Sequence, residues 1–423
     1  MPAERNTIAI IGLGYVGLPL AIAFAENYDV LGFDVNENRI EELSNGIDST
    51  LEAAEEEIIN SHIKFTSNIE SIAKASIYII TVPTPVRDDK TPDLRNLVSA
   101  TESVSSVLSK GNYVIYESTV YPGTTEEVCI PILENSTDMK CNIDFYVGYS
   151  PERINPGDQS KSIKEIIKVT SGSNEESSVF IDNLYSKIIE AGTHRASSIK
   201  VAEAAKVIEN TQRDINIALA NELSIIFSHL DIDTHEVLDA AATKWNFHRF
   251  VPGMVGGHCI GVDPYYLTYK SEQVGYKPEM ILAGRKLNDG MAHYYAKTIC
   301  QKMEQENYHL SSSKILIMGM TFKENCPDYR NTKVVDLIND LISKGIAVDV
   351  FDPFLVKEHI KKEFKLNLIE DLPENFYDAI VIAVSHSQFK TMGIEKIRRF
   401  GKSGSFIFDI KNTFPIKNDL IRI

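Results

Sequence analysis

One cysteine of this chain stands in a setting that suits covalent chemistry. Cys259 lies in the run GGHCIGVDP, from Gly256 to Pro264, with glycines on both sides of the thiol. Glycine allows a ligand to approach the backbone closely, so the loop predicts an accessible thiol. A thiolate is both a good nucleophile and a good leaving group. The competing interpretation is a small buried apolar residue, the usual state of a lone cysteine.

A nucleotide-binding turn opens the chain. The apolar run Thr7 to Ile11 predicts a strand buried on both faces, and it leads into GLGYVG and then the helix-like LPLAIAFAE. In such a turn Gly12 permits the tight bend, Gly14 lets a pyrophosphate approach, and Gly17 allows close packing of helix on strand. The N-terminus of the following helix offers N–H donors to the phosphates.

An acidic residue completes the dinucleotide pattern. The apolar strand Val30 to Phe33 ends in Asp34, twenty residues beyond Gly14. A carboxylate there accepts hydrogen bonds from ribose hydroxyls and repels a ribose phosphate, so the pattern predicts NAD rather than NADP. A glycine-rich turn of another α/β protein is the alternative, which the strand, helix and acid together disfavour.

Polar residues follow further predicted strands. Ligands of open parallel sheets bind beyond the carboxyl ends of the strands, so these residues are expected to line a site. For the adjacent Glu and Arg, a solvated ion pair is the alternative. The strands are Ile77 to Val82, Tyr113 to Tyr116 and Phe145 to Gly148, and the residues at their ends are Thr81 to Pro85, Thr119, and Glu152 with Arg153.

A long helix is predicted in the middle of the chain. Lys200 to His229 has helical periodicity without Pro or Gly, which corresponds to about 45 Å. Lys206, Asn210 and Arg213 are spaced by four and three residues, so they share one face. That face is either part of a site or an ordinary solvated surface.

The strand–helix alternation restarts near Ser313. The strand Lys314 to Met318 runs into GMTFKENCPDYR, which lacks the GxGxxG pattern. We therefore expect a second nucleotide-type domain that holds a different nucleotide-bearing ligand through Lys and Arg contacts. The predicted fold class is α/β, with two Rossmann-like doubly wound parallel-sheet domains joined by a long central helix and a helical dimerisation region. The predicted domains are 1–197, binding NAD; 198–308, helical with the cysteine loop; and 309–423, binding the sugar nucleotide.

The composition narrows the class of partner. The net charge of −16 argues against nucleic acid. Five cysteines without a CxxC pair fit free thiols in a reducing compartment rather than a disulfide framework or a metal site. The chain has neither a signal-peptide pattern nor a run of 18 apolar residues. These features predict a cytoplasmic protein that does not bind membranes.

Taken together, these motifs resemble the UDP-glucose/GDP-mannose dehydrogenase family over essentially the whole chain, above all its branch acting on UDP-N-acetylhexosamines. The resemblance rests on GLGYVGLPLA, STVYPGTT, SPERINPG, KVIENTQRDINIALANE, GGHCIGVDPYYL and FKENCPDYRNTK. It implies two successive hydride transfers to NAD, in which a sugar alcohol becomes an aldehyde, then a thioester on Cys259, and finally a uronate. It also implies a homodimer and a role in surface polysaccharide precursor synthesis.

The same resemblance implies roles for individual residues. Lys206 and Asn210 would stabilise oxyanions, Asp263 would hold a water or accept a proton, and Glu152 with Thr119 would orient water. The implied cofactor contacts are Gly12, Gly14, Tyr15, Val16, Gly17, Asp34, Arg39, Thr81, Pro83, Thr119 and Arg330. The implied substrate contacts are Glu152, Arg153, Lys206, Asn210, Arg249, Gly256, Phe322 and Lys323, with no metal ligand in the set.

Departures from the family pattern bear on the substrate. Relatives acting on UDP-glucose usually carry other residues at the positions of His258 and Val262, and those acting on UDP-N-acetylmannosamine at the positions of Met254 and Gly261. We therefore expect UDP-N-acetylglucosamine or UDP-N-acetylgalactosamine, with UDP-glucose and UDP-N-acetylmannosamine as alternatives. Other readings are a single-hydride 3-hydroxyacid dehydrogenase, a non-catalytic NAD sensor and a cysteine hydrolase, all of which leave part of the constellation unused.

Overall fold

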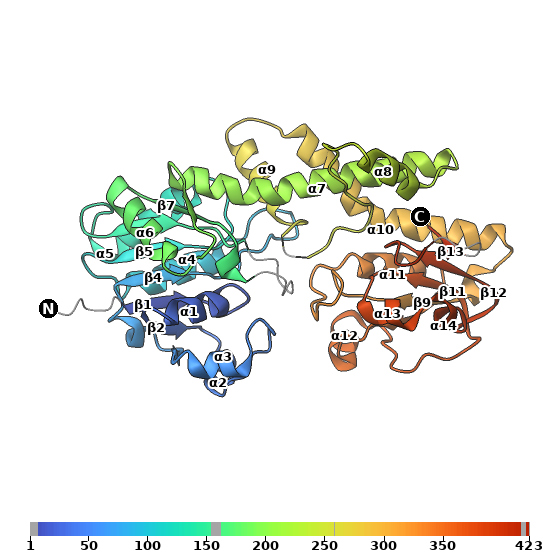
Figure 1. The fold of residues 1–423 in the computed structure, drawn as a ribbon, viewed down its shortest axis with the longest axis horizontal. Coiled ribbons are helices and arrows are strands. Elements are labelled where there is room, and N and C mark those ends of the chain that lie inside the picture. Colours follow the sequence, from blue (N-terminus) through green and yellow to red (C-terminus); the bar gives the residue numbers. More distant parts are fainter. Residues whose placement is uncertain (1–6, 154–161, 258, 416–419, 423) are drawn as a thin grey trace. The chain divides into compact units, whose positions relative to one another are not determined.

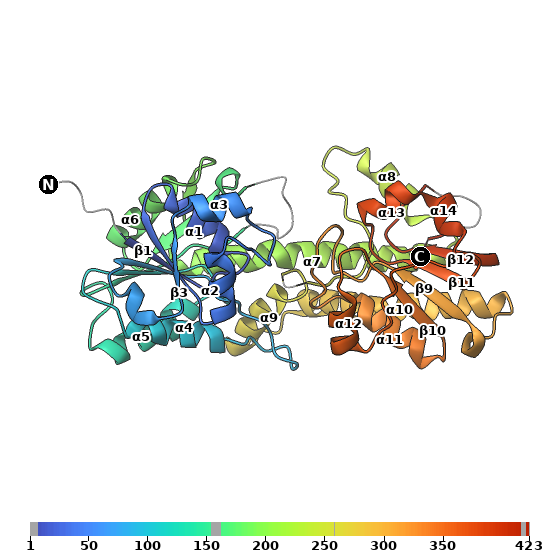
Figure 2. The same cartoon turned by 90° about the horizontal axis from the view of Figure 1, so that it is seen from below.

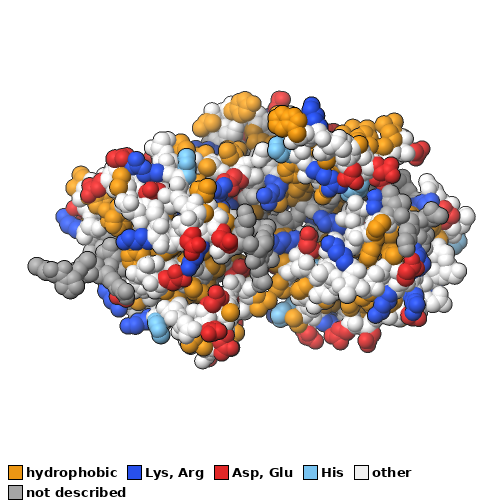
Figure 3. All heavy atoms as spheres, viewed as in Figure 1, with side chains coloured by type: hydrophobic (Ala, Val, Ile, Leu, Met, Phe, Trp, Pro, Cys, Tyr) orange, Lys and Arg blue, Asp and Glu red, His pale blue; other side chains and the backbone are white. Residues whose placement is uncertain are grey.

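Two β-sheets organise the chain, one in each of the two units into which its residues divide (Figure 1). The computed structural model describes residues 7–153, 162–257, 259–415 and 420–422. One unit comprises Met1–Glu209 with Tyr265–Lys277, and the other Asn210–Pro264 with Pro278–Ile423. The predicted division into three domains at 197 and 308 stays a prediction. Acidic and basic side chains are interspersed over the face shown in Figure 3.

The first sheet has the strand order β3-β2-β1-β4-β5-β6-β7-β8. Neighbouring strands are parallel except β6 and β7, which are antiparallel. The order reverses between β1 and β4, and ligands of open α/β sheets bind at such a switch point. The strands are β1 (Thr7–Ile11), β2 (Asp29–Phe33), β3 (Lys64–Thr66), β4 (Ile77–Ile80), β5 (Tyr113–Tyr116), β6 (Tyr146–Tyr149), β7 (Lys168–Gly172) and β8 (Thr193–Arg195).

Helices cover both faces of this sheet. On one face α1 (Gly17–Ala25) and α6 (Glu175–Ser186) bury apolar side chains such as Phe24 and Ile181. On the other face lie α4 (Arg95–Ser105) and α5 (Ile130–Thr137) (Figure 2), which bury Leu97 and Leu133. The unit also contains α2 (Glu37–Ser44), α3 (Glu55–Asn60), the 3₁₀ helices η1 (Ile69–Ile72) and η3 (Ile163–Glu165), and the π-helix η2 (Thr125–Cys129).

The second sheet is parallel throughout its described strands, in the order β10-β9-β11-β12-β13. Its strands are β9 (Lys314–Met318), β10 (Ala347–Phe351), β11 (Tyr377–Ile382), β12 (Gly401–Asp409) and β13 (Leu420–Ile421). Helices α10 (Glu279–Gln305), α11 (Val334–Ser343) and α12 (Lys357–Phe364) pack on one face. Helices α13 (Ser387–Met392) and α14 (Ile394–Arg398) pack on the other (Figure 2). The short helix η4 (Leu310–Ser312) precedes β9.

The long helix α7 (Ile199–His229) begins in the first unit and continues in the second. It is followed by α8 (Thr234–Ala242) and, after the cysteine loop, by α9 (Asp263–Gln273). The predicted α/β class with two parallel-sheet domains and a long helix is confirmed, although the antiparallel β7 was not anticipated.

Candidate active site

The turn after β1 is built as the glycine pattern predicts. Gly12 has φ +94° and its N–H donates to the carbonyl of Phe33 over 2.8 Å. A Cβ on Gly17 would lie 1.8 Å from the carbonyl oxygen of Gly12 and 2.6 Å from Oγ1 of Thr81. Close packing of α1 on the turn therefore requires glycine at position 17.

Gly14 differs from its two neighbours in the motif. A Cβ there would meet no protein atom within 4 Å, so internal packing does not account for this glycine, whereas close approach of a phosphate would. Tyr15 and Val16 complete the turn, and α1 begins at Gly17, directing its first N–H groups toward the same edge. These features fit the pyrophosphate of a dinucleotide.

Asp34 lies at the end of β2, half-buried beside the turn. Its Oδ2 accepts from the N–H of Leu13 at 2.8 Å, and its Oδ1 from the N–H of Asn36 at 2.9 Å. Each carboxylate oxygen has two acceptor sites, so capacity is left for ribose hydroxyls.

Arg39 is buried behind the same turn. Its Nε donates to the carbonyl of Leu13 at 2.9 Å, and its guanidinium pairs with Asp48 at 2.7 Å and with Glu42 at 3.4 Å. The guanidinium is therefore shared with two carboxylates and braces the turn. This pairing disfavours recognition of a ribose phosphate and agrees with NAD.

Hydroxyl side chains tie the ends of β4 and β5 together. Oγ1 of Thr81 donates to the carbonyl of Gly12 at 2.7 Å. Oγ of Ser118 donates to the carbonyl of Val82 at 2.7 Å, and Oγ1 of Thr84 to that of Thr119 at 2.6 Å. Pro83 lies between these anchored residues, so the loop that carries Thr81, Pro83 and Thr119 is fixed at the switch point.

Glu152 and Arg153, which follow β6, are not a solvated ion pair with each other. Glu152 is 7% exposed, and its Oε2 lies 3.3 Å from Nζ of the buried Lys168. Arg153 instead pairs with Glu209 of α7 at 2.8 Å and donates to the carbonyl of Ile167 at 2.9 Å. Of the two residues, Glu152 is therefore the candidate for a catalytic role, whereas Arg153 is held by structural contacts.

In α7, Lys206 and its neighbours differ sharply in exposure. Lys206 is only 9% exposed, and among the described residues its ammonium makes no hydrogen bond or ion pair with a side chain. Asn210 is half-buried, and Arg213 is exposed. The shared helix face is therefore not simply a solvated surface along its length, because its lysine is withdrawn from solvent.

One turn before Lys206, Glu203 anchors the loop that follows Thr119. Its carboxylate accepts from the N–H groups of Gly123, at 2.5 Å, and Thr125, at 2.9 Å. Burial raises the pKa of Glu203 to about 7, although the two N–H donors oppose the shift. This carboxylate couples the helix that carries Lys206 to the Thr119 loop.

The cysteine loop packs against the second sheet's first turn. A Cβ on Gly256 would lie 2.7 Å from the carbonyl oxygen of Asn331, and one on Gly257 would lie 2.7 Å from the ring of Phe322. Cys259 is half-buried, and its carbonyl accepts from the N–H of Asp263 at 2.8 Å at the start of α9. Glycines are thus required by close packing, and His258 lies outside the described residues.

Asp263 is joined to α7. Its carboxylate is 3% exposed, and Oδ2 accepts from Nδ2 of Asn210 at 2.6 Å. The structure therefore brings together two of the predicted catalytic residues directly. Cys129, Cys300 and Cys326 are buried, whereas Cys141 is half-buried like Cys259. None of the five cysteines forms a disulfide.

Phe322 and Lys323 form the turn after β9, with the N–H of Phe322 donating to the carbonyl of Asp328 at 3.0 Å. The ammonium of Lys323 lies 5.6 Å from the centre of the Phe322 ring. Arg330 is exposed and makes a bidentate pair with Asp328, at 3.0 and 2.8 Å. Arg249 pairs with Asp239 of α8 at 2.8 Å, on the surface.

Sequence reasoning missed Lys411, two residues beyond the end of β12. It lines a small enclosed pocket that Gly256, Phe322 and Lys333 also line. Burial lowers the pKa of Lys411, opposed by the charge of Glu324. The signal available in the sequence was its position just after a strand's carboxyl end, where ligand-binding residues collect. Arg249 does not line this pocket.

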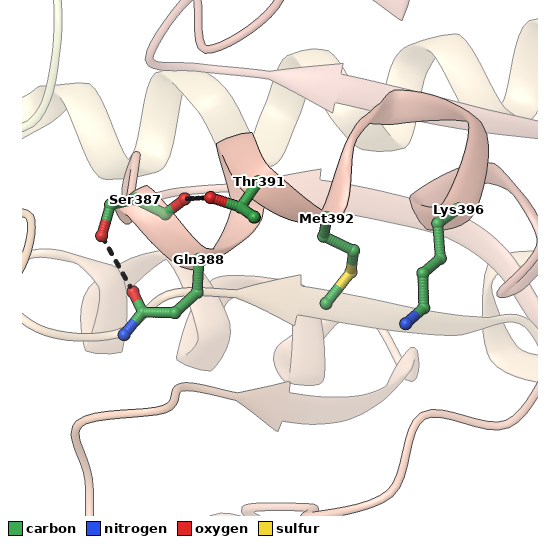
Figure 4. A pocket seen from close by; sticks show the side chains of 5 residues that line it. All are labelled: Ser387, Gln388, Thr391, Met392 and Lys396. Carbon is green, nitrogen blue, oxygen red and sulfur yellow. Dashed lines mark hydrogen bonds between the residues drawn. The ribbon is translucent and has the colours of Figure 1, made fainter.

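A second hollow lies on the surface over α13 and α14 (Figure 4), lined by Ser387, Gln388, Thr391, Met392 and Lys396. Oγ of Ser387 donates to Oε1 of Gln388 at 3.3 Å, and Oγ1 of Thr391 to the carbonyl of Ser387 at 3.0 Å. It is open and carries a single charged side chain, so we place the chemistry elsewhere.

Among the described residues, no group of three His, Cys, Asp or Glu side chains is arranged to hold a metal ion. In the same part of the chain, no helix is long and apolar enough to cross a bilayer.

Comparison with known proteins agrees with this geometry. Models of the UDP-glucose/GDP-mannose dehydrogenase family match in three segments, as the NAD-binding domain at residues 6–189, the central domain at 200–290 and the UDP-binding domain at 316–415. The NAD prediction is thereby confirmed. The three matches together also disfavour the single-hydride, sensor and hydrolase readings.

Individual relatives align over nearly the whole chain. UDP-N-acetyl-D-glucosamine 6-dehydrogenase of Salmonella typhi is 54% identical over 421 residues, 99% of each chain. The enzyme of the same name from Pseudomonas aeruginosa is 55% identical over 96% of each chain. The solved structure of a UDP-D-ManNAc dehydrogenase from Pyrococcus horikoshii has a TM-score of 0.89 at 30% identity and covers 98% of each chain. The chain therefore belongs to the UDP-glucose/GDP-mannose dehydrogenase family and is an NAD-dependent dehydrogenase.

Proposed function

We propose that this enzyme oxidises the six-position alcohol of UDP-N-acetylglucosamine or UDP-N-acetylgalactosamine to the uronate, with NAD as the acceptor. The observation that carries the proposal is the Cys259 loop, whose glycines pack against Phe322 and Asn331 and whose cysteine is half-buried and not part of a disulfide. The relatives at 54% and 55% identity support the glucosamine form.

The reaction removes four electrons in two stages. NAD, when bound, accepts a hydride at each stage, so two molecules of NAD are reduced for each sugar. In the first stage the alcohol loses a hydride and a proton and becomes an aldehyde. The sulfur of Cys259 then bonds to the aldehyde carbon, and loss of the second hydride leaves a thioester. Water displaces the thiolate, which returns Cys259 and releases the carboxylate.

The described residues supply the charges that these steps need. We assign Lys206 and Asn210 to the oxyanion that forms at each addition, because Lys206 is a buried ammonium without a side-chain partner among the described residues. Asp263, held by Asn210 at 2.6 Å, would accept the proton of the alcohol or of the attacking water. Glu152 and Thr119 would orient that water. The backbone N–H of Arg153 donates to Oε1 of Glu152 and would hold that side chain in place.

The second unit would hold the uridine diphosphate. We assign Phe322, Lys323 and Gly256 to that ligand as the family resemblance implies, and add Lys411, which lines the same pocket as Gly256 and Phe322. The ammonium groups of Lys323 and Lys411 would supply two positive charges to the diphosphate. Arg249 as a further substrate contact and Arg330 as a cofactor contact remain part of the proposal.

A homodimer is also proposed. Apolar side chains about half exposed to solvent recur along α7 at Val201, Ile208, Leu219 and Ile226. Their spacings of seven and eleven residues place them in one stripe, and a second copy of the chain is the partner that the family resemblance implies. Sedimentation velocity tests this, and a monomer throughout the micromolar range would contradict it. The cytoplasm and surface polysaccharide precursor synthesis remain the expected setting.

The alternative substrate is UDP-N-acetylmannosamine, because the Pyrococcus horikoshii structure named for that activity superimposes with a TM-score of 0.89. The deciding experiment measures NADH formed per sugar with UDP-N-acetylglucosamine, UDP-N-acetylgalactosamine, UDP-N-acetylmannosamine and UDP-glucose. We expect two NADH per sugar, with the highest kcat/KM for one of the first two.

The matched variants are Cys259→Ser and, as a control on a buried thiol remote from the loop in sequence, Cys300→Ala. Serine is a poorer nucleophile and leaving group, so uronate formation should fall about 1000-fold or more. The control should form uronate at the rate of the unmodified enzyme. One NADH per sugar with an active Cys259→Ser enzyme would contradict the thioester route.

A further inference from the structure

A buried ammonium lies between two buried carboxylates at the site edge of the first sheet. Nζ of Lys168 is 2.6 Å from Oε2 of Glu117 and 3.3 Å from Oε2 of Glu152. The three residues are 2%, 2% and 7% exposed. The cluster therefore joins Glu152, which we assign to the reaction, to two charged groups that the reaction does not itself use.

The sheet topology explains how these residues meet. Glu117 follows β5 and Glu152 comes three residues after β6, so both lie at the carboxyl ends of parallel strands. Lys168 is the first residue of β7, which runs antiparallel to β6 with Tyr149 opposite Ser171. Continuing that register three residues past Tyr149 sets Glu152 opposite Lys168. The antiparallel strand thus delivers a lysine to the ligand-binding edge.

The carboxylate oxygens of the cluster are engaged. The hydroxyl of Tyr185, from α6, donates to Oε1 of Glu117, and its ring centre lies 5.3 Å from the Lys168 ammonium. Oε1 of Glu152 accepts from the N–H of Arg153 at 2.5 Å. Among the groups that face Glu152 are therefore Lys168, the Glu117 carboxylate behind it, Tyr185 and the backbone of Arg153.

The cluster holds one carboxylate more than neutrality requires. Burial raises the pKa of Glu117 to about 7, the charge of Lys168 opposing the shift and that of Glu152 adding to it. Burial by itself would lower the pKa of Lys168, but the two carboxylates more than reverse this, so it is raised. Lys168 stays charged while Glu117 changes charge near neutral pH.

A buried ion pair of Lys168 with Glu152 alone would already be neutral. Burying a further carboxylate costs free energy, and an apolar or amide side chain at position 117 would avoid that cost. The extra carboxylate takes the closer contact with the lysine, at 2.6 Å against 3.3 Å. It thereby draws part of the positive charge away from Glu152.

We propose that Lys168 is a positioning residue for Glu152, and that Glu117 sets the share of the Lys168 charge that Glu152 receives. The inference rests on the proposed function in one respect, namely that Glu152 takes part in the reaction as a carboxylate. Lys168 fixes the side chain of Glu152 through their contact at 3.3 Å. Glu117 weakens this effect when it is ionised and releases it when it is protonated.

The test compares the pH dependence of kcat for uronate formation in two variants with that of the unmodified enzyme, between pH 5 and 9. Below about pH 7 Glu117 is already protonated, so Glu117→Gln should match the unmodified enzyme there and exceed its kcat increasingly as the pH rises through 7, where ionised Glu117 draws Lys168 away. In the double variant Lys168→Met with Glu117→Gln, Glu152 loses its contact with Lys168, so kcat should be lower than in Glu117→Gln at every pH and show no step near pH 7. The differences in kcat should be about 10-fold, the scale of losing one hydrogen bond to a charged group.

A purely structural role predicts another result. Both variants would then lose thermal stability and rate while keeping profiles that superimpose on that of the unmodified enzyme, and this outcome would overturn the inference. Lys314→Met, which removes the 2.7 Å pair with Asp349 in the second sheet, shows how loss of a partly buried ion pair alone behaves. If the double variant does not fold, Glu117→Gln decides alone, because it leaves one cation with one carboxylate.

Two readouts separate this inference from the proposed function. NADH formed per sugar reports the four-electron route whatever the profiles do. Glu152→Gln reports the role of Glu152, and full activity in that variant would overturn the inference while leaving the thioester route in place. Two NADH per sugar, an inactive Glu152→Gln enzyme and unmoved profiles would reject the role of Lys168 alone.

Discussion

In both units a strand runs into a glycine with positive φ, +94° at Gly12 after β1 and +88° at Gly319 after β9. In both, the glycine N–H donates to the last carbonyl of the neighbouring strand, to Phe33 over 2.8 Å and to Phe351 over 2.9 Å. The two sheets thus begin with the same turn, although their sequences share no GxGxxG pattern. The difference between them lies in the residues around that turn.

The correspondence extends to an acid at the end of the neighbouring strand. The N–H of Leu13 donates to Oδ2 of Asp34 at 2.8 Å, and the N–H of Met320 donates to Oδ2 of Asp352 at 2.7 Å. In each unit one carboxylate therefore fastens the turn to the second strand. That shared function does not depend on the ligand.

The two acids differ in what else they bind. Asp34 is half-exposed and keeps acceptor capacity toward solvent. Asp352 is 5% exposed, and it also accepts from the N–H groups of Thr321, at 3.1 Å, and Phe354, at 2.9 Å, while Nε2 of His386 lies 3.2 Å away. Because the carboxylate of Asp352 is buried and accepts hydrogen bonds within its own domain, it is not placed to bind a ribose as Asp34 would. Conserving a turn does not conserve the ligand it binds.

The largest effect that sharpens this comparison is expected at Gly17. In Gly17→Ala the added Cβ must displace the backbone carbonyl of Gly12, 1.8 Å away, which should cost about 3 kcal/mol or more of the free energy of unfolding. Gly14→Ala is the matched control, because its Cβ meets no protein atom within 4 Å. It should keep the thermal stability of the unmodified enzyme and bind NAD more weakly.

Calorimetry with and without NAD measures both variants. If Gly14→Ala unfolded as early as Gly17→Ala, the two glycines would serve packing alike, and the assignment of Gly14 to the pyrophosphate would lose its support.

The next effect concerns pH, because buried carboxyls of the two units shift in opposite directions. Burial raises the pKa of Glu203 in the first unit to about 7. For Asp352 in the second unit, burial acts upward, but His386 and the N–H donors outweigh it and lower the pKa. A raised carboxyl stabilises the fold below its unfolded pKa and loses this contribution as pH rises through the folded value. A lowered one contributes above its unfolded pKa and loses the contribution in acid.

We therefore expect the unmodified enzyme to lose stability relative to Glu203→Gln as the pH rises from 5 to 8, by up to about 3 kcal/mol. The contribution of Asp352 should be constant over that range and fall only below about pH 4. Urea unfolding at pH 5, 6.5 and 8 measures the difference between the two proteins. If the unmodified enzyme instead gained stability relative to Glu203→Gln as the pH rose, the raised pKa assigned to Glu203 would be contradicted.

Much of this arrangement was accessible from the sequence because it depends on local patterns. Strands β1, β5 and β9 were predicted to the residue, and α7 to within one residue. The glycines of the first turn and of the Cys259 loop were predicted too, since packing and turn geometry restrict the residue type within a few positions. Such features can be predicted because they depend on residues that are close together in the sequence.

What the sequence did not reveal depends on pairing between distant segments. Lys168 looked like an ordinary residue of a strand, because nothing near it indicates that β7 runs antiparallel to β6 and faces Glu152. Glu117 was not predicted as a functional residue either, because its contact with Lys168 depends on the same pairing of distant strands. Lys411 escaped notice because its burial becomes visible only when β12 is placed in its sheet.

The smallest and most specific effect is that substituting Asp34 should change NAD affinity but not stability, whereas substituting Asp352 should change stability but not NAD affinity. Asp34→Asn should weaken NAD binding about 10- to 100-fold, because hydrogen bonds to a charged group contribute about 1.5–3 kcal/mol. Its stability should change little, since the half-exposed side chain can still accept from Leu13. Asp352→Asn should leave NAD affinity unchanged and lower the free energy of unfolding by about 2 kcal/mol, because an amide cannot accept from all its buried N–H donors at once. Isothermal titration with NAD and urea unfolding of both variants measure the four quantities, and weakened NAD binding in Asp352→Asn would show that the second turn also takes part in holding the dinucleotide.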